Sequence, residues 1–452
     1  MPTMTSHFPQ KTTGVSLSTA IASPTIPAAL PTTQIITTST PRLLATSDLL
    51  FLSHNRLLRW DHVTQYSSSI AENVVSFSSN ALGSKIALLR PRGVAANGNE
   101  LFDLDLLDIS SKQTRHLLEA APSIVNMSLS PDGSWLAFQQ ITSGNPAIFL
   151  LQLSESATAV SLTGCESHGL GQDLTGCSPV VWSPDSRTLL WSDRRGIWIA
   201  STVTGSAIQL HSNVVEIADP QGKTTQIDVQ FSSLEWSPVG RFALIQVFPN
   251  QSEASWHAVI DSLTGKIGQV LDSYKIDSSE VSVSWLPGGF LSVARASDPM
   301  HSLPASIQIW NVLATNTDLL VSNSRYEIPS NLLSEHPASI AVADSDLSSL
   351  HLDWVQQISP DHLLFGASRP DESSNVWLFD FSLQTNAFVD IFQLQNKIAR
   401  VLWAPDGSGL LVITSSGQAI FVSPDGEKRS ELESTAGSDP NSFIWLPPSW
   451  RK

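Results

Sequence analysis

The sequence predicts an all-β fold, an eight-bladed β-propeller with four-stranded antiparallel blades, and a seven-bladed ring is the alternative. Three observations predict it: a turn motif that recurs along the chain, short apolar runs on both sides of each turn, and chain ends that supply complementary parts of one blade. Repeats of about 50 residues that hold several short strands are typical of propeller blades.

The recurring turn is clearest in WSPDS at Trp182, WSPVG at Trp236 and WAPDG at Trp403. Proline presets φ at the second position of a type I turn, and a following Asp and Gly complete a tight hairpin. Aligned on this proline, or on the residue in its place, the repeats fall at Ser79, Pro131, Pro184, Pro238, Pro287, Pro360, Pro405 and Pro447. The repeats at Pro287 and Pro360 are poorly marked, and they decide between eight blades and seven.

Each repeat is expected to contain four strands in a fixed order. In the best-marked repeat these are PVVW at 179–182, TLLWS at 188–192, GIWIAS at 196–201 and AIQL at 207–210. The first is a continuous apolar run that ends in Trp, which suits an inner strand buried on both faces. Short turns such as TVTGS join the third strand to the fourth.

The two chain ends together predict how the ring closes. Residues 48–70 supply a second, third and fourth strand, and residues 442–449 supply a first strand with nothing after it. Sharing one blade between the ends removes open sheet edges that would otherwise invite aggregation. We therefore assign residues 47–452 to the propeller.

Residues 1–46 have a different composition. The stretch from Lys11 to Pro41 is dominated by Thr, Ser, Pro and Ala, and Lys11 is its only charged residue. Such a segment buries too little apolar surface to fold and is expected to be a disordered spacer. Pro24 and Pro27 interrupt its apolar run, so it is not expected to be an export signal. No run in the chain approaches 20 apolar residues, so we expect no membrane span.

The charge of the chain and its motifs argue against some classes of function. The net charge is −16 and there is no basic run, so nucleic acid is not an expected partner. The turn aspartates Asp132, Asp185, Asp361 and Asp406 have a sufficient structural role, because Asp hydrogen-bonds its own backbone in such turns. No nucleophile elbow or metal-ligand spacing is present, so we expect no catalytic residue, metal or cofactor.

The only two cysteines, Cys165 and Cys177, flank a Gly-rich loop. A disulfide across a loop of this size would stabilise the fold by about 3 kcal/mol in the loop-entropy model. A bridged pair would favour a compartment outside the cytosol. Two free thiols in one loop are the alternative.

The repeat WSPDSRTLLWSDRRGIWIASTVTGSAIQL at 182–210 resembles the TolB-like, WD40-like propeller repeats of bacterial extracytoplasmic proteins. The resemblance runs from Asp48 to the C-terminus and implies the fold and a periplasmic or cell-surface location. It does not imply one function, since such repeats occur in translocation accessory proteins and in peptidase gating domains. Intracellular WD-repeat proteins are the competing family, but a Trp-Asp dipeptide that ends a third strand occurs only at Trp60.

Loop lengths predict a binding face. Turns between strands one and two and between three and four are short. The loops on the other face vary in length, and the connection at residues 212–225 is among the long ones. Such insertions often mark the binding side. We expect contacts with a ligand from five residues on this long-loop face: Arg90, Arg92, Asn145, His301 and Arg369. The leading hypothesis is a non-catalytic, exported or surface-tethered scaffold that binds a protein or glycan. A hydrolase or lyase at the channel mouth and an intracellular scaffold are the alternatives.

Overall fold

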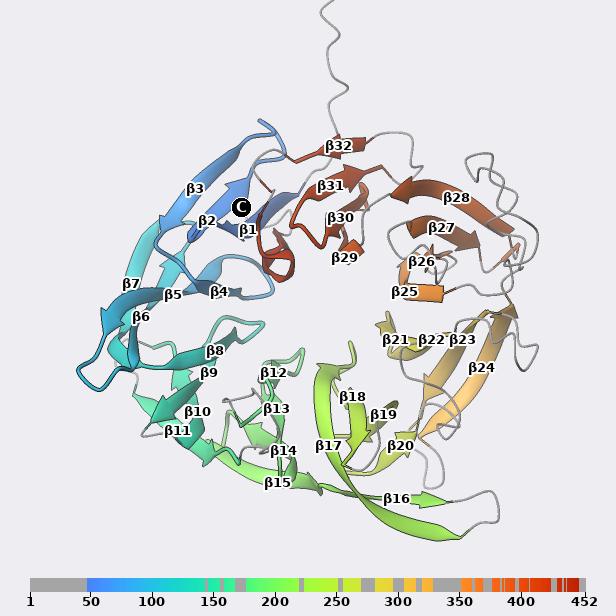
Figure 1. Ribbon diagram of the computed structural model, residues 1–452, viewed down its shortest axis with the longest axis horizontal. Coiled ribbons are helices and arrows are strands. Elements are labelled where there is room, and N and C mark those ends of the chain that lie inside the picture. Colours follow the sequence, from blue (N-terminus) through green and yellow to red (C-terminus); the bar gives the residue numbers. More distant parts are fainter. Residues whose placement is uncertain are drawn as a thin grey trace, which may run out of the picture. The chain divides into compact units, whose positions relative to one another are not determined.

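The computed structural model is an all-β chain whose antiparallel sheets follow one another around a ring (Figure 1). Residues 43–452 form one compact unit. The predicted spacer, residues 1–46, lies outside the residues that the structure describes. Those are 47–142, 145–154, 158–166, 176–218, 223–250, 255–269, 281–295, 305–313, 319–327, 351–359, 362–368, 376–382, 384–385, 387–394, 398–405, 407–423, 429–432, 435 and 437–446.

Hydrogen-bond pairing places the described strands in eight sheets. The first sheet has the order β3-β2-β1-β33 and contains β1 (Asp48–Ser53), β2 (Arg56–Trp60), β3 (Ser67–Glu72) and β33 (Ile444–Leu446). The second sheet contains β4 (Ser76–Ser79), β5 (Lys85–Val94), β6 (Glu100–Asp108) and β7 (Gln113–Pro122), and the third contains β8 (Ile124–Leu129), β9 (Trp135–Thr142), β10 (Asn145–Gln152) and β11 (Ala159–Gly164). The fourth sheet contains β12 (Val181–Trp182), β13 (Thr188–Asp193), β14 (Gly196–Ser201) and β15 (Ser206–Ser212).

The sheets of the second half are β16 (Val214–Ala218), β17 (Thr224–Trp236), β18 (Phe242–Pro249), β19 (Trp256–Asp261) and β20 (Ile267–Gln269); β21 (Val281–Leu286), β22 (Phe290–Arg295), β23 (Ser306–Val312) and β24 (Leu320–Glu327); β25 (His351–Ser359), β26 (His362–Ser368), β27 (Val376–Ser382) and β28 (Ala387–Leu394); and β29 (Ile398–Trp403), β30 (Leu410–Thr414), β31 (Ala419–Val422) and β32 (Arg429–Glu431). The prediction of four-stranded antiparallel blades in a ring is confirmed, and one sheet has a fifth strand.

The two ends of the described chain meet in one sheet. Strand β33 pairs antiparallel with β1, so that Leu50 lies opposite Ile444. The rings of Phe51 and Phe443 stack with centroids 5.2 Å apart. These two rings belong to a buried apolar layer that includes Phe421 of the neighbouring β29–β32 sheet. Burial of this layer joins the first and last strands of the ring through the hydrophobic effect.

The turns between first and second strands are built by the residues that the sequence singled out. The Ser183 hydroxyl donates to Asp185 Oδ1 at 2.6 Å, and the same carboxylate accepts from the backbone N–H of Arg187. The Ser183 hydrogen bond lowers the pKa of Asp185 below its usual value. Ser130 and Asp132 repeat the first of these contacts at 2.6 Å. The prediction that these aspartates serve the turn is therefore confirmed for both.

Tryptophans at the ends of inner strands link successive sheets. Each donates its indole N–H to a backbone carbonyl of the sheet before it, at distances of 3.0 to 3.3 Å. The pairs are Trp182 to Ser128, Trp236 to Val181, Trp285 to Glu235 and Trp445 to Leu402. The recurring Trp therefore fills the core and also satisfies a backbone carbonyl of the neighbouring sheet.

Candidate functional site

The predicted arginines Arg90 and Arg92 both lie on β5 and both form ion pairs. Arg90 Nε lies 3.0 Å from Asp105, and Arg92 Nη1 lies 3.1 Å from Asp103 and 2.7 Å from Glu119. These carboxylates belong to β6 and β7 of the same sheet. A hydrogen bond from Arg92 to Asp103 is the main reason that the pKa of Arg92 is raised. The two cations are thus already neutralised within their own sheet.

Of the other three predicted contact residues, the structure describes only the backbone of Asn145. Asn145 begins β10, where its backbone lies opposite Thr142. His301 and Arg369 lie outside the described residues. Their role on the long-loop face stays a prediction.

Cys165 and Cys177 form a disulfide with their Cα atoms 5.5 Å apart. The backbone of Cys177 also forms an isolated antiparallel β-bridge with the backbone of Asp193 at the end of β13. The side chain of Asp193 is buried. Asp193 accepts hydrogen bonds from the backbone N–H of Glu166 at 3.2 Å and from the indole of Trp198 at 2.9 Å. The disulfide therefore sits against the loop between the second and third strands of its sheet.

A hairpin that sequence reasoning missed gives the clearest candidate site. The connection after β15 was predicted as a variable loop, but residues 214–218 and 224–228 pair as strands β16 and the first part of β17. Strand β17 then continues into the ring, where it pairs with β18. This arm formed by β16 and the start of β17 extends past the outer side of β20 in Figure 1.

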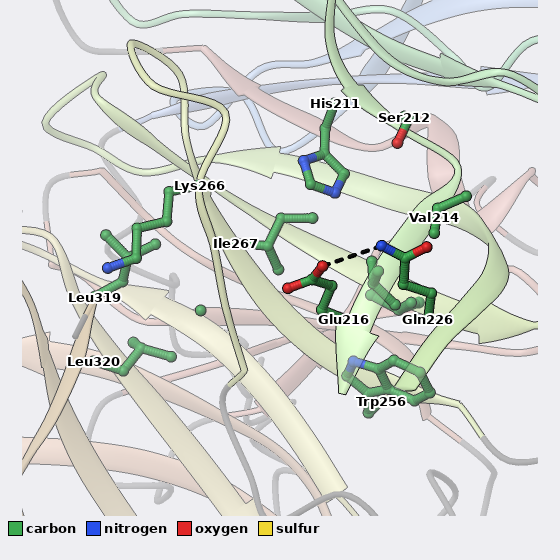
Figure 2. A pocket seen from close by; sticks show the side chains of 13 residues that line it. His211, Ser212, Val214, Glu216, Gln226, Trp256, Lys266, Ile267, Leu319 and Leu320 are labelled. Carbon is green, nitrogen blue, oxygen red and sulfur yellow. Dashed lines mark hydrogen bonds between the residues drawn. The ribbon is translucent and has the colours of Figure 1, made fainter. Parts of the chain in front are cut away.

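A cavity of about 890 Å³ lies between this arm and the outer strands of the ring. Figure 2 shows Lys266 and Leu319 on one side and Val214 and Gln226 on the other. Gln226 donates a hydrogen bond to Glu216 at 3.1 Å across the two strands of the arm. The lining is His211, Ser212, Val214, Val215, Glu216, Gln226, Val247, Trp256, Lys266, Ile267, Gly268, Leu319 and Leu320.

His211 connects the cavity to the ring. Its Nδ1 lies 2.9 Å from the carbonyl oxygen of Gly265, so Nδ1 carries the proton and donates. Burial lowers the pKa of His211 below its usual value of 6.5, and the hydrogen bond to Gly265 opposes that shift only in part. The imidazole is therefore neutral at neutral pH. It offers a polar edge beside aliphatic walls.

The lining suits recognition of a ligand that is partly apolar and partly polar. Val, Ile and Leu side chains supply apolar walls, while Glu216 and Lys266 supply one charge of each sign. Polar and apolar groups contribute to this lining in similar measure, and placed polar groups of this kind fix the orientation of a bound ligand. Within the described ranges, no three His, Cys, Asp or Glu side chains are grouped as a metal ion would require.

The sequence predicts no membrane-spanning segment. The described part of the chain has no helix that is long and apolar enough to cross a membrane.

No protein-family model matches the chain, and no curated protein matches it either. Solved structures do match. Dipeptidyl peptidase 4 of Porphyromonas gingivalis is 10% identical with a TM-score of 0.55, over 86% of this chain and 58% of that one. A eukaryotic initiation factor is 12% identical with a TM-score of 0.50, over 89% of each chain.

TolB from Acinetobacter baumannii also matches, at 13% identity over 88% of this chain and 81% of that chain. Its TM-score of 0.36 is too low to support the TolB-like resemblance. At these identities a match shows the fold alone. The chain is therefore a β-propeller protein, and its similarity to a peptidase and to an initiation factor decides nothing about its activity.

Proposed function

We propose that this protein is a non-catalytic, exported or surface-tethered propeller that binds a protein or glycan on its long-loop face. The observation that carries the proposal is the cavity under the β16–β17 arm. The arm grows from one of the long connections assigned to that face, and Val214, Glu216 and Gln226 of the arm line the cavity. The residues Arg90, Arg92, Asn145, His301 and Arg369 remain proposed contacts on the same face.

The location outside the cytosol rests on two points. The disulfide between Cys165 and Cys177 is typical of oxidising compartments. The TolB-like character of the repeats points the same way. Residues 1–46 then serve as a spacer that holds the propeller away from its point of attachment.

We infer further that the ring is an eight-bladed propeller closed by the sheet that contains both chain ends. The eight sheets and the pairing of β1 with β33 support this inference. A closed ring keeps the arm and the outer strands at a fixed separation, which is what a binding cavity between them requires.

A binding screen with displayed glycans and peptides tests the proposal. The variant Glu216→Ala removes the carboxylate of the arm, and Glu431→Ala removes an exposed glutamate of the outer strand β32 as a matched control. We expect a ligand that binds the unmodified protein and the Glu431 variant but loses at least about tenfold in affinity with the Glu216 variant. No ligand in either library, or equal affinity for both variants, contradicts the proposal.

A further inference from the structure

Exposed apolar side chains lie at short turns of several sheets, and Val63, Tyr66 and Leu82 belong to the sheets of β1–β3 and β4–β7. Five others belong to three successive sheets, β12–β15, β16–β20 and β21–β24. They are Val203, Val239, Leu263, Phe290 and Leu313, which we call the apolar turn patch, and they are between 39% and 83% exposed. Val203, Leu263 and Leu313 follow third strands, while Val239 and Phe290 belong to turns between first and second strands.

Hydrogen bonds place the two kinds of turn on the same side of each sheet. The backbone N–H of Thr202, next to Val203, donates to the carbonyl of Arg187 at 2.9 Å. The N–H of Ser262, next to Leu263, donates to the carbonyl of Arg241 at 3.0 Å. Each bond joins the turn after the third strand to the start of the second, so both turns of a sheet lie together.

The turns between first and second strands lie next to one another from sheet to sheet. A Cβ built at Gly289 would lie 2.9 Å from Val239 Cγ2, which shows how closely these two turns pack. A Cβ at Gly240 would lie 3.5 Å from Pro184 Cδ in the sheet before. Phe290 lies opposite Asn311 in the strand pairing, two residues from Leu313.

Two of these turns have no carboxylate at a position where other turns have one. At the position after the turn proline, Asp132 and Asp185 accept hydrogen bonds that stabilise the turn. The equivalent positions are Val239 and Gly288, so two neighbouring turns have lost that carboxylate. An exposed valine in a turn adds no local hydrogen bond, which points to a contact with another molecule.

The charge of the chain and of the turns around the patch indicates which kind of molecule the patch contacts. The chain carries a net charge of −16. Around the patch, among the described residues of these turns, three cations outnumber two carboxylates: Arg187, Arg241 and Lys266 against Asp185 and Asp261. A basic partner would be drawn to the acidic remainder of the surface, and an anionic membrane would repel the chain. Two copies of the chain, by contrast, meet at the lowest electrostatic cost where neither is acidic.

We propose that the apolar turn patch is the contact surface between two copies of this chain, related by a two-fold axis. The same side chains of both copies then pack against each other in a self-complementary interface. The patch supplies the apolar centre, and the surrounding Ser, Thr and Gly turns supply the rim of an interface of about 800 Å² per copy. The long-loop faces of the two copies point outward, so the dimer presents two binding faces to one target and gains in avidity.

Sedimentation velocity over a range of concentrations tests this proposal with the full chain. Val239→Asp is the main variant, because it restores the residue that the chain itself uses at Asp132 and Asp185 and so leaves the turn intact. Leu263→Asp is a second variant at a separate turn. Val94→Asp changes a residue that is 67% exposed on β5, outside the patch, and is the matched control.

We expect a dimer for the unmodified chain and the Val94 variant, with dissociation constants at least about tenfold weaker for the two patch variants. An unmodified chain that stays monomeric at all concentrations overturns the proposal. A dimer that both patch variants leave unchanged also overturns it. So does a monomer that binds vesicles of uncharged lipid through the patch. The glycan and peptide screen above measures the effect of Glu216 on the arm, which the dimer experiment leaves unchanged, so either proposal can fail alone.

Discussion

The indole N–H of Trp236 donates a hydrogen bond to the carbonyl oxygen of Val181, 3.1 Å away in the sheet before it. The residues are 55 apart in the chain, and the same kind of contact recurs at spacings of 54, 50 and 43. The tryptophan of each turn motif therefore ends an inner strand and also forms a hydrogen bond to the neighbouring blade.

Replacing Trp236 by Phe keeps an aromatic ring in the core but leaves the carbonyl of Val181 without its donor. An unsatisfied buried acceptor costs about 1–3 kcal/mol, so the urea midpoint should fall accordingly. Trp135→Phe is the control, because the described structure shows no hydrogen bond from its indole. Equal losses for the two variants would mean that the inter-blade bond contributes nothing beyond packing.

Gly196 has a φ of 140°, and a Cβ there would overlap the carbonyl oxygen of His211. We expect Gly196→Ala to destabilise the fold by several kcal/mol, of the order seen for severe steric conflict. Gly98 has a φ of 85° but no atom within 4 Å of a Cβ, so Gly98→Ala should cost only about 1 kcal/mol of backbone strain. Thermal unfolding of both variants measures the difference, and similar losses would contradict the close approach of β14 to β15.

Reduction of the disulfide has a predicted cost. Removal of the bridge between Cys165 and Cys177 frees a loop of 12 residues and should lower the free energy of unfolding by about 3 kcal/mol. The double variant with Ser at both positions should match the reduced protein in urea unfolding. A midpoint that does not respond to reductant would show that the loop is held by Asp193 and its partners instead.

Burial lowers the pKa of His211. Its stabilising contribution is therefore complete above its unfolded pKa of about 6.5 and is lost as the pH falls through the lower folded value. The free energy of unfolding should decrease between pH 7.5 and pH 5, and His211→Asn should reduce that decrease. Burial also lowers the pKa of His257, so this residue accounts for part of the remaining dependence of the free energy of unfolding on pH. The same pH slope in the protein with and without His211 would rule out its role.

The fold was largely predictable because local chemistry and global packing agree at the turns. The sequence WSPDS combines a core Trp, a turn proline and an Asp whose hydrogen bonds close the turn. In the structure Trp182 packs in the core and Asp185 accepts hydrogen bonds within the turn. The ring arrangement then follows from repetition. Asp132 and Asp185 could be given a structural role for the same reason.

The candidate site was less predictable because it depends on a tertiary arrangement. Residues 214–218 and 224–228 show alternation that signals a hairpin, but their place in an inter-blade connection suggested a loop. Nothing in the sequence shows that Glu216 and Lys266 line one cavity, since Glu216 lies on β16 and Lys266 lies in the turn before β20. Arg90 and Arg92 stay proposed ligand contacts, and the sequence alone does not show that Asp105 and Asp103 lie across the sheet from them.

The central claim is that one sheet contains both ends of the propeller. Paired cysteines at Leu50 and Ile444, which lie opposite each other on β1 and β33, measure this most directly. Under mild oxidation we predict a disulfide-linked peptide that contains both positions, detected by mass spectrometry after proteolysis. The control pair Leu50→Cys and Val293→Cys, with the second position on β22, should give none. Failure of the first pair to cross-link in folded protein, or equal yields from both pairs, would contradict a ring closed by its own termini.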